Sequence, residues 1–166
     1  MIKITIVDYG SGNVLSAQKS FIKIAKDNNI EAEVLISKKL NDIKSSTHIV
    51  LPGQGAFSTC MNGLKKTDGL IEELCEFALI KKKPFLGICV GMQMLAEISE
   101  ENGDHEGLGW IDGQIKLLPG DNLKLPHMGW NLAIPTNSKY NNLISTKNDY
   151  YFVHSYYFEC TDKHNI

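Results

Sequence analysis

Cys89 has the surroundings best suited to chemistry in this chain. An apolar run over residues 85–88 precedes it, a helical pattern follows it, and Gly87 and Gly91 stand two positions away on either side. A cysteine on a sharp strand-to-helix turn needs such neighbours, because the turn crowds the backbone on both sides. A helix N-terminus next to it favours the thiolate, and the Val90 N–H is placed to stabilise an oxyanion. The pattern therefore favours a nucleophile elbow over a buried structural cysteine between incidental glycines.

A second glycine-rich segment, residues 52–57 (PGQGAF), follows another short apolar run. Two glycines separated by one residue let a backbone come close to an anionic ligand or intermediate. On these residues alone, an ordinary turn at the end of a strand is the favoured interpretation.

The elements that must position these segments alternate along the chain. Apolar runs predict strands, and apolar residues at helical spacing predict helices. The predicted strands cover residues 2–7, 32–36, 48–51 and 85–88, and the predicted helices cover 14–25, 70–78 and 90–98. This order indicates an open α/β sheet. After Gly103, short β-like pieces at residues 114–118 and 150–156 predict an antiparallel part.

Composition bounds the class of protein. The chain has 166 residues, 43% of them hydrophobic, and a formal net charge of -2. These values suit one domain and argue against a general affinity for nucleic acid. Residues 1–5 lack the features of a signal peptide, and no apolar run could span a bilayer, so we expect a cytoplasmic protein without membrane contact. The four cysteines lack metal-site spacing and are expected to be reduced thiols.

Four segments together resemble one protein family. Residues 87–93 (GICVGMQ) resemble the nucleophile motif of class I glutamine amidotransferases. Residues 8–13 (DYGSGN), 126–131 (PHMGWN) and 151–156 (YFVHSY) resemble the glutaminases that serve imidazole glycerol phosphate synthases. The resemblance implies a flavodoxin-like fold with an open, mostly parallel twisted sheet flanked by helices and a late antiparallel part. It also implies a single glutamine amidotransferase domain over residues 1–166.

The resemblance assigns roles to individual positions. Cys89 would be the nucleophile, and the N–H groups of Gln54 and Val90 would form the oxyanion hole. The substrate-binding positions would be Gly53, Gly55, Gln93, Glu101, Ser155 and Tyr156. Gln93 lies four residues after Cys89, which would place both on one helix face. For Glu101 a solvated charge run is a serious alternative, because its assignment rests on spacing alone.

The implied reaction is hydrolysis of glutamine through a Cys89 thioester, without a metal or an organic cofactor. The ammonia would pass to a (β/α)₈-barrel cyclase in a heterodimer that makes imidazole glycerol phosphate in histidine biosynthesis. Asn13 and Trp130 would lie at or near the interface with this partner. The ordinary alternatives are an asparagine in a tight turn and a tryptophan that fills a core.

One part of the family pattern is not found in this sequence. The general base of the family is a histidine in a Phe-His-Pro-Glu segment, and none of the five histidines here is followed two residues later by an acid. His154 is not the matching residue. We therefore expect a partial sequence that lacks the last strands and the terminal helix, rather than a protein that has lost its activity. Without this base, the chain as written should be at most weakly active.

Three other functions remain open. A paralogous glutaminase could supply ammonia to a synthase that modifies surface sugars. A non-catalytic subunit could bind the synthase partner without hydrolysing glutamine. Another elbow-cysteine hydrolase, such as a γ-glutamyl hydrolase, is opposed by residues 126–131.

Overall fold

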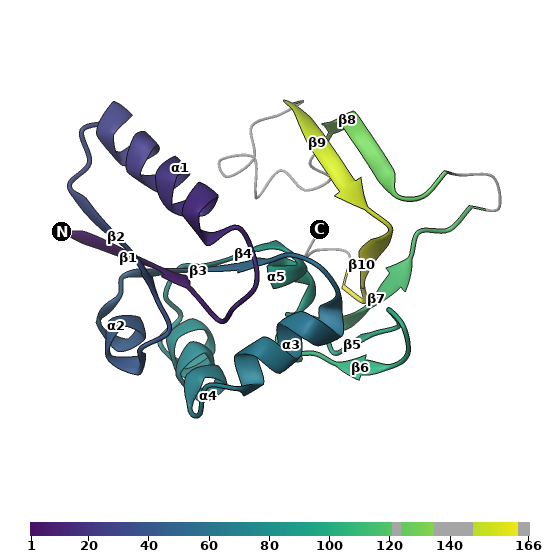
Figure 1. The fold of residues 1–166 in the computed structure, drawn as a ribbon, viewed down its shortest axis with the longest axis horizontal. Helices are drawn as coiled ribbons and strands as arrows, with labels where there is room; N and C mark the ends of the chain where they lie inside the picture. The colour runs from purple at the N-terminus through teal and green to yellow at the C-terminus, as the bar shows by residue number, and fades with distance from the viewer. Residues whose placement is uncertain (121–123, 135–147, 163–166) are drawn as a thin grey trace. The chain divides into compact units, whose positions relative to one another are not determined.

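The computed structural model of the chain describes residues 1–120, 124–134 and 148–162 (Figure 1). It contains two compact units, Met1–Leu95 and Ala96–Ile166. The single domain expected over residues 1–166 stays a prediction. Within the described residues, no helix combines the length and the apolar character that a membrane span requires.

A parallel four-stranded sheet forms the centre of the first unit, in the order β2-β1-β3-β4 (Figure 1). Its strands are β1 (Ile2–Val7), β2 (Ala32–Ser37), β3 (His48–Gly53) and β4 (Phe85–Cys89). The four apolar runs predict these strands correctly. In the ladder of β3 and β4, Gly53 pairs with Cys89. Since parallel strands end at the same edge of a sheet, this register brings the two predicted functional segments together.

Helices flank this sheet on both sides. They are α1 (Val14–Asp27), α2 (Leu40–Ser45), α3 (Phe57–Lys65), α4 (Leu70–Cys75), the π-helical turn η1 (Glu76–Ile80) and α5 (Val90–Gln93). Figure 1 shows α1 on one face of the sheet, and α2, α3 and α4 on the other. The predicted open α/β sheet flanked by helices is therefore confirmed. The sequence did not predict α2 and α3, although Phe57, Cys60, Met61 and Leu64 follow helical spacing and are buried.

The two faces of the sheet bury different cores. Ile4, Ile6 and Val50 form a buried cluster, against which Val14 and Phe21 of α1 pack. Side chains alternate along a strand, so Val7 and Leu51 point to the opposite face, and neither is exposed to solvent. The apolar faces of α3 and α4 lie on that side. Burial on both faces explains why the strands have continuous apolar sequences.

The helix predicted over residues 90–98 begins at Val90 as expected but is shorter than predicted, because α5 ends at Gln93. The Leu95 N–H donates to the carbonyl of Met92, which tightens the last turn. The Glu97 N–H donates to the carbonyl of Gly113 at 3.1 Å, so this backbone joins a sheet instead of continuing the helix. Residues 93–96 are all buried, whereas a surface helix would expose one side.

The second unit consists mainly of short strands. One sheet has the order β10-β7-β5-β6 and contains β5 (Ile98–Ser99), β6 (His105–Glu106), β7 (Gly113–Leu117) and β10 (Tyr156–Cys160). A separate antiparallel hairpin pairs β8 (His127–Ala133) with β9 (Asn148–His154). The late antiparallel part is confirmed. The continuous strand expected over residues 150–156 is wrong, because β9 and β10 pair with different strands on either side of Ser155.

The packing of α3 leads to a stability prediction. Leu64 is fully buried, so we expect Leu64→Ala to lower the free energy of unfolding by about 2–5 kcal/mol, through lost burial and a residual cavity. Urea denaturation measures this change. The matched control is Lys65→Ala, which changes an exposed residue of the same helix and should stay within about 0.5 kcal/mol of the parent. Equal effects of the two substitutions would contradict the placement of α3.

Candidate active site

Cys89 occupies a strained elbow. It is the last residue of β4 and the N-cap residue of α5, with φ of 56° and ψ of -120°. A positive φ is uncommon for a residue with a Cβ, and a conformation of this kind costs on the order of 1–3 kcal/mol. Cys89 is exposed, so its thiol can meet a substrate. A nucleophile on a sharp turn between a strand and a helix has this geometry.

Glycines allow the elbow to press against β3. A Cβ on Gly91 would overlap the carbonyl oxygen of Leu51, and a Cβ on Gly53 would overlap the backbone N of Gly91. A Cβ on Gly87 would lie 2.6 Å from the Cα of Met92. The two glycines beside Cys89 are therefore required by the turn. The sequence assigned Gly53 to approach of an anionic group, and the structure gives it a steric role beside the elbow.

The segment after β3 lies next to this elbow. Gly53 is buried and in register with Cys89, whereas Gln54 and Gly55 are exposed. Gly55 has φ of +94°, a conformation that favours glycine. Val90, whose N–H follows the nucleophile, is 7% exposed. The backbone of both segments thus reaches the same edge of the sheet as the thiol, where acyl transfer would need donors for an oxyanion.

The predicted substrate-binding residues are divided between the two units. Gln93 ends α5 and is buried. Cys89 caps this helix from outside, so the four-residue spacing does not by itself place Gln93 beside the thiol. Glu101, Ser155 and Tyr156 belong to the second unit and are half-buried. The Glu101 N–H donates to Ser99 Oγ at 3.2 Å, and the Ser155 carbonyl accepts from the Leu118 N–H at 2.8 Å. Their grouping with Cys89 stays a prediction.

Two residues that the sequence did not single out hold the segment after β3. The Tyr9 hydroxyl donates to the Pro52 carbonyl at 2.6 Å, and the Ser11 hydroxyl donates to the Gln54 carbonyl at 2.8 Å. Burial raises the pKa of Tyr9 above its usual range, so Tyr9 remains a phenol and a donor. From the sequence, residues 8–13 are only a turn that resembles the family, with an interface role for Asn13. Contacts between positions more than 40 residues apart leave no signal in sequence spacing.

His154 is fully engaged within the second unit. Its Nδ1 lies 3.0 Å from the Tyr156 carbonyl oxygen, which can only accept, so Nδ1 carries the proton. Its Nε2 then accepts from Nδ1 of His127 at 3.2 Å, and Nε2 of His127 accepts from the Asn131 amide at 3.4 Å. The chain of bonds is consistent with the expectation that His154 does not serve as the catalytic base.

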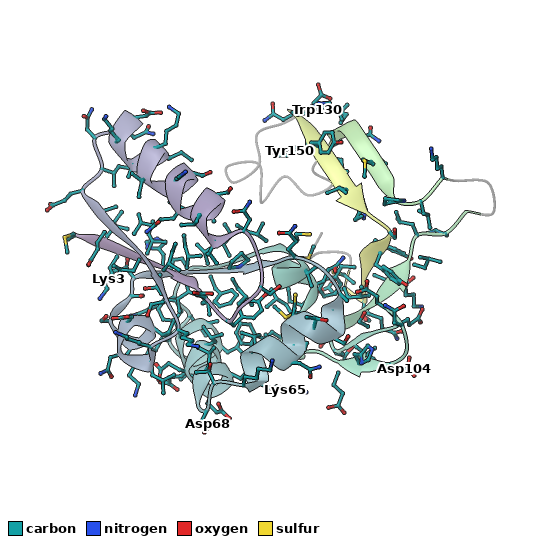
Figure 2. The ribbon with its side chains drawn as sticks, viewed as in Figure 1. Lys3, Lys65, Asp68, Asp104, Trp130 and Tyr150 are labelled. Carbon is teal, nitrogen blue, oxygen red and sulfur yellow. The ribbon has the colours of Figure 1, made fainter. Side chains whose placement is uncertain are left out.

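The two predicted interface residues have different surroundings. Asn13 caps α1, because its Oδ1 accepts from the Ser16 N–H at 3.1 Å, and this is the ordinary turn role that the sequence left open. Trp130 is 74% exposed on the β8–β9 hairpin, so it does not fill a core within the described part of the chain (Figure 2). Its ring makes a T-shaped contact with Tyr151 at 5.7 Å between centroids.

A cysteine nucleophile on an elbow at the edge of a parallel sheet defines a class of enzymes that form covalent acyl intermediates. The sequence model of glutamine amidotransferase class-I matches residues 5–165, and the chain belongs to this family. The imidazole glycerol phosphate synthase subunit HisH of Pelagibacter ubique is 47% identical over 98% of this chain and 78% of its own length. The protein of that name from Rhodospirillum rubrum is 43% identical over 97% of this chain and 77% of its own length. A crystal structure of a glutamine amidotransferase, 14% identical, shares the fold with a TM-score of 0.68 over 96% of this chain and 75% of that chain.

The strain at the elbow predicts an unusual order of stability. Cys89→Gly relieves the positive φ, whereas Cys89→Ala keeps the strain. Glycine also makes the unfolded chain more flexible, which lowers the free energy of unfolding of the Gly variant. The relief of strain is larger, so the Gly variant should still be more stable than the Ala variant by about 1 kcal/mol. Urea denaturation of the two variants measures this difference. At an ordinary β-strand position the order is reversed, so a more stable Ala variant would contradict the strained elbow.

The hydrogen bonds in the hairpin predict the tautomers of both histidines. His127 and His154 should each carry the proton on Nδ1 near neutral pH, because each Nδ1 has an acceptor and each Nε2 has a donor. Nitrogen-15 NMR of the imidazole rings distinguishes the two tautomers. His48, whose Nδ1 lies 2.9 Å from the Thr47 hydroxyl, provides an internal comparison outside the hairpin. A protonated Nε2 on His154 would rule out the proposed direction of this chain of bonds.

Proposed function

We propose that this chain is the glutaminase subunit of an imidazole glycerol phosphate synthase and works in histidine biosynthesis. The observation that carries the proposal is Cys89 on a strained elbow, in register with Gly53, within a class-I glutamine amidotransferase. Relatives between 39% and 47% identical bear the name of the HisH subunit of that synthase. Four free cysteines are compatible with a cytoplasmic location, which is part of the proposal.

The proposed reaction begins at the thiol. The Cys89 thiolate attacks the side-chain amide carbon of glutamine, and the N–H groups of Gln54 and Val90 stabilise the tetrahedral oxyanion. The C–N bond then breaks, ammonia leaves with a proton from a general acid, and a glutamyl thioester remains on Cys89. Water hydrolyses this thioester and releases glutamate. His154 is not assigned the proton transfer, because His127 and the Tyr156 carbonyl engage both of its ring nitrogens.

The substrate-binding positions complete this proposal. Gly53 and Gly55 would let the backbone approach the reacting amide, and Gln93 would hold the substrate from the end of α5. In the second unit, Glu101 would bind the α-amino group, while the backbone of Ser155 and Tyr156 would bind the carboxylate. These groups offer a carboxylate for a cation and N–H donors for an anion, which matches the two charges of free glutamine.

The proposed partner is a (β/α)₈-barrel cyclase that receives the ammonia in a heterodimer. Support comes from an exposed apolar face on the β8–β9 hairpin, where strand alternation puts five side chains on one side. They are Met128, Trp130, Leu132, Tyr151 and Val153, each between 46% and 74% exposed. Aromatic residues and methionine are enriched in protein interfaces, and apolar patches of this kind mark binding sites. Asn13 is kept as a second interface position, with its capping role as the weaker support.

Labelling of the protein tests the nucleophile. A diazo-ketone analogue of glutamine should modify Cys89 and should leave Cys60, Cys75 and Cys160 unmodified, because only Cys89 is exposed. Peptide mass spectrometry locates the label. Cys89→Ala should abolish labelling, and the matched control Cys75→Ala should not change it. A label on any other cysteine would refute the site assignment.

Kinetics of the complex test the pathway. Glutamine hydrolysis should rise strongly when the cyclase and its nucleotide substrate are added, because the partner then receives the ammonia. An unchanged rate would refute the role in histidine biosynthesis. A rise with a sugar-modifying synthase instead would favour the paralogous glutaminase. Binding of the cyclase without any hydrolysis would indicate a non-catalytic subunit.

A further inference from the structure

A small polar cluster lies beneath the segment that follows β3. Tyr9, Ser11 and Cys60 come from two parts of the chain, the turn after β1 and the helix α3. The Tyr9 hydroxyl donates to the Pro52 carbonyl, and the Ser11 hydroxyl donates to the Gln54 carbonyl. Cys60 Sγ lies 3.1 Å from Ser11 Oγ and 3.5 Å from the Gln54 carbonyl oxygen. We call these three residues the carbonyl clamp.

Close packing encloses Tyr9 and Cys60, whereas Ser11 is half-buried. Tyr9 is 6% exposed and Cys60 is fully buried. A Cβ on Gly63 of α3 would lie 2.8 Å from Cδ2 of Tyr9, so the helix backbone presses directly on the ring. Gly12, with φ of +90°, lies so close to β3 that its Cβ would be 3.0 Å from Cβ of Pro52. The turn after β1 therefore has little freedom to move away from β3.

Fixing a carbonyl also fixes the N–H group of the next residue. A peptide unit is planar and trans, so its C=O and N–H point in opposite directions. The bond to Pro52 thus sets the direction of the Gly53 N–H, and the bond to Gln54 sets that of the Gly55 N–H. Gly55 in particular could otherwise rotate widely, because it has no Cβ and open space around it.

We propose that Tyr9 and Ser11, with Cys60, are positioning residues. They hold the two peptides on either side of the Gly53–Gln54 peptide, and through them the Gln54 N–H, in the orientation needed for glutamine hydrolysis. The inference rests on the proposed function, because it gives these peptides a role at the reacting amide. For this role the three clamp side chains need no contact with the substrate. They act through the backbone of Pro52 and Gln54, at the edge of the sheet where β3 meets the elbow.

Paired variants separate this role from general stability. In the synthase complex, Tyr9→Phe and Ser11→Ala should each lower kcat by about 10- to 100-fold, because small displacements of positioned groups are costly in catalysis. KM for glutamine should change by less than about twofold, since the interaction is needed mainly in the transition state. Ser11→Thr restores a hydroxyl and should recover most of the activity.

The control is Ser45→Ala. Ser45 Oγ also donates to a backbone carbonyl, that of Asp42 at 3.2 Å, but it lies on α2, away from residues 53–55. This variant should keep the parental kcat. Wild-type kcat in Tyr9→Phe and Ser11→Ala would overturn the proposal. Ser11→Thr could also lose as much kcat as Ser11→Ala and show the same fall in Tm. The clamp would then have only a structural role, and the proposal would be overturned.

A spectroscopic measurement distinguishes failure of the clamp from failure of the proposed function. Carbon-13 NMR of the protein should show an upfield shift of the Pro52 carbonyl in Tyr9→Phe and of the Gln54 carbonyl in Ser11→Ala, as each loses its donor. Unchanged carbonyl resonances would overturn the clamp even if glutamine is hydrolysed. Absence of hydrolysis by the wild-type complex would overturn the proposed function, and with it the catalytic role of the clamp, whatever the resonances show.

Discussion

The close approach of the elbow backbone to β3 is the contact on which the rest of the candidate site depends. Gly91 lies so near the Leu51 carbonyl that no Cβ fits between them, and a Cβ on Gly53 would likewise overlap the Gly91 amide. This approach is possible only because β3 and β4 run parallel and pair Gly53 with Cys89. One register thus sets both the position of the thiol and that of the backbone beside it.

The strain at Cys89 is maintained by the packing behind it. A positive φ at a residue with a Cβ costs on the order of 1–3 kcal/mol. Met94 and Ala96 are fully buried just after α5, and Val90 and Leu95 are nearly so. Burying one side chain the size of methionine contributes about 1.5–3 kcal/mol, so the residues that follow the elbow together outweigh the strain. The nucleophile can therefore remain exposed in a conformation that an isolated turn would avoid.

The parts of the fold that the sequence predicts are those with a local signal. Buried parallel strands have continuous apolar sequences, and the elbow has glycines whose steric purpose can be worked out from the turn. The helix after Cys89 was predicted too long, because the Glu97 N–H pairs with Gly113, a tertiary contact that overrides local pattern. Helix α3 has apolar residues at helical spacing, but it was not predicted because it directly follows the glycine turn at residues 52–55. Tyr9 and Ser11 could not be predicted, because their targets are 43 positions away.

Gly53 and Gly55 give the segment after β3 extra backbone freedom, which creates a need for the clamp. Glycine gives close approach, but it leaves a segment with more conformations to lose, at about 1–2 kcal/mol of backbone entropy for each ordered residue. Each clamp hydrogen bond contributes about 0.5–1.5 kcal/mol, so two of them offset the ordering of roughly one residue. The clamp is thus too weak to serve as a main source of stability for the fold. It is strong enough to select the orientation of the Pro52–Gly53 and Gln54–Gly55 peptides, which flank the peptide that carries the Gln54 N–H. An oxyanion site needs its donors oriented before its substrate arrives.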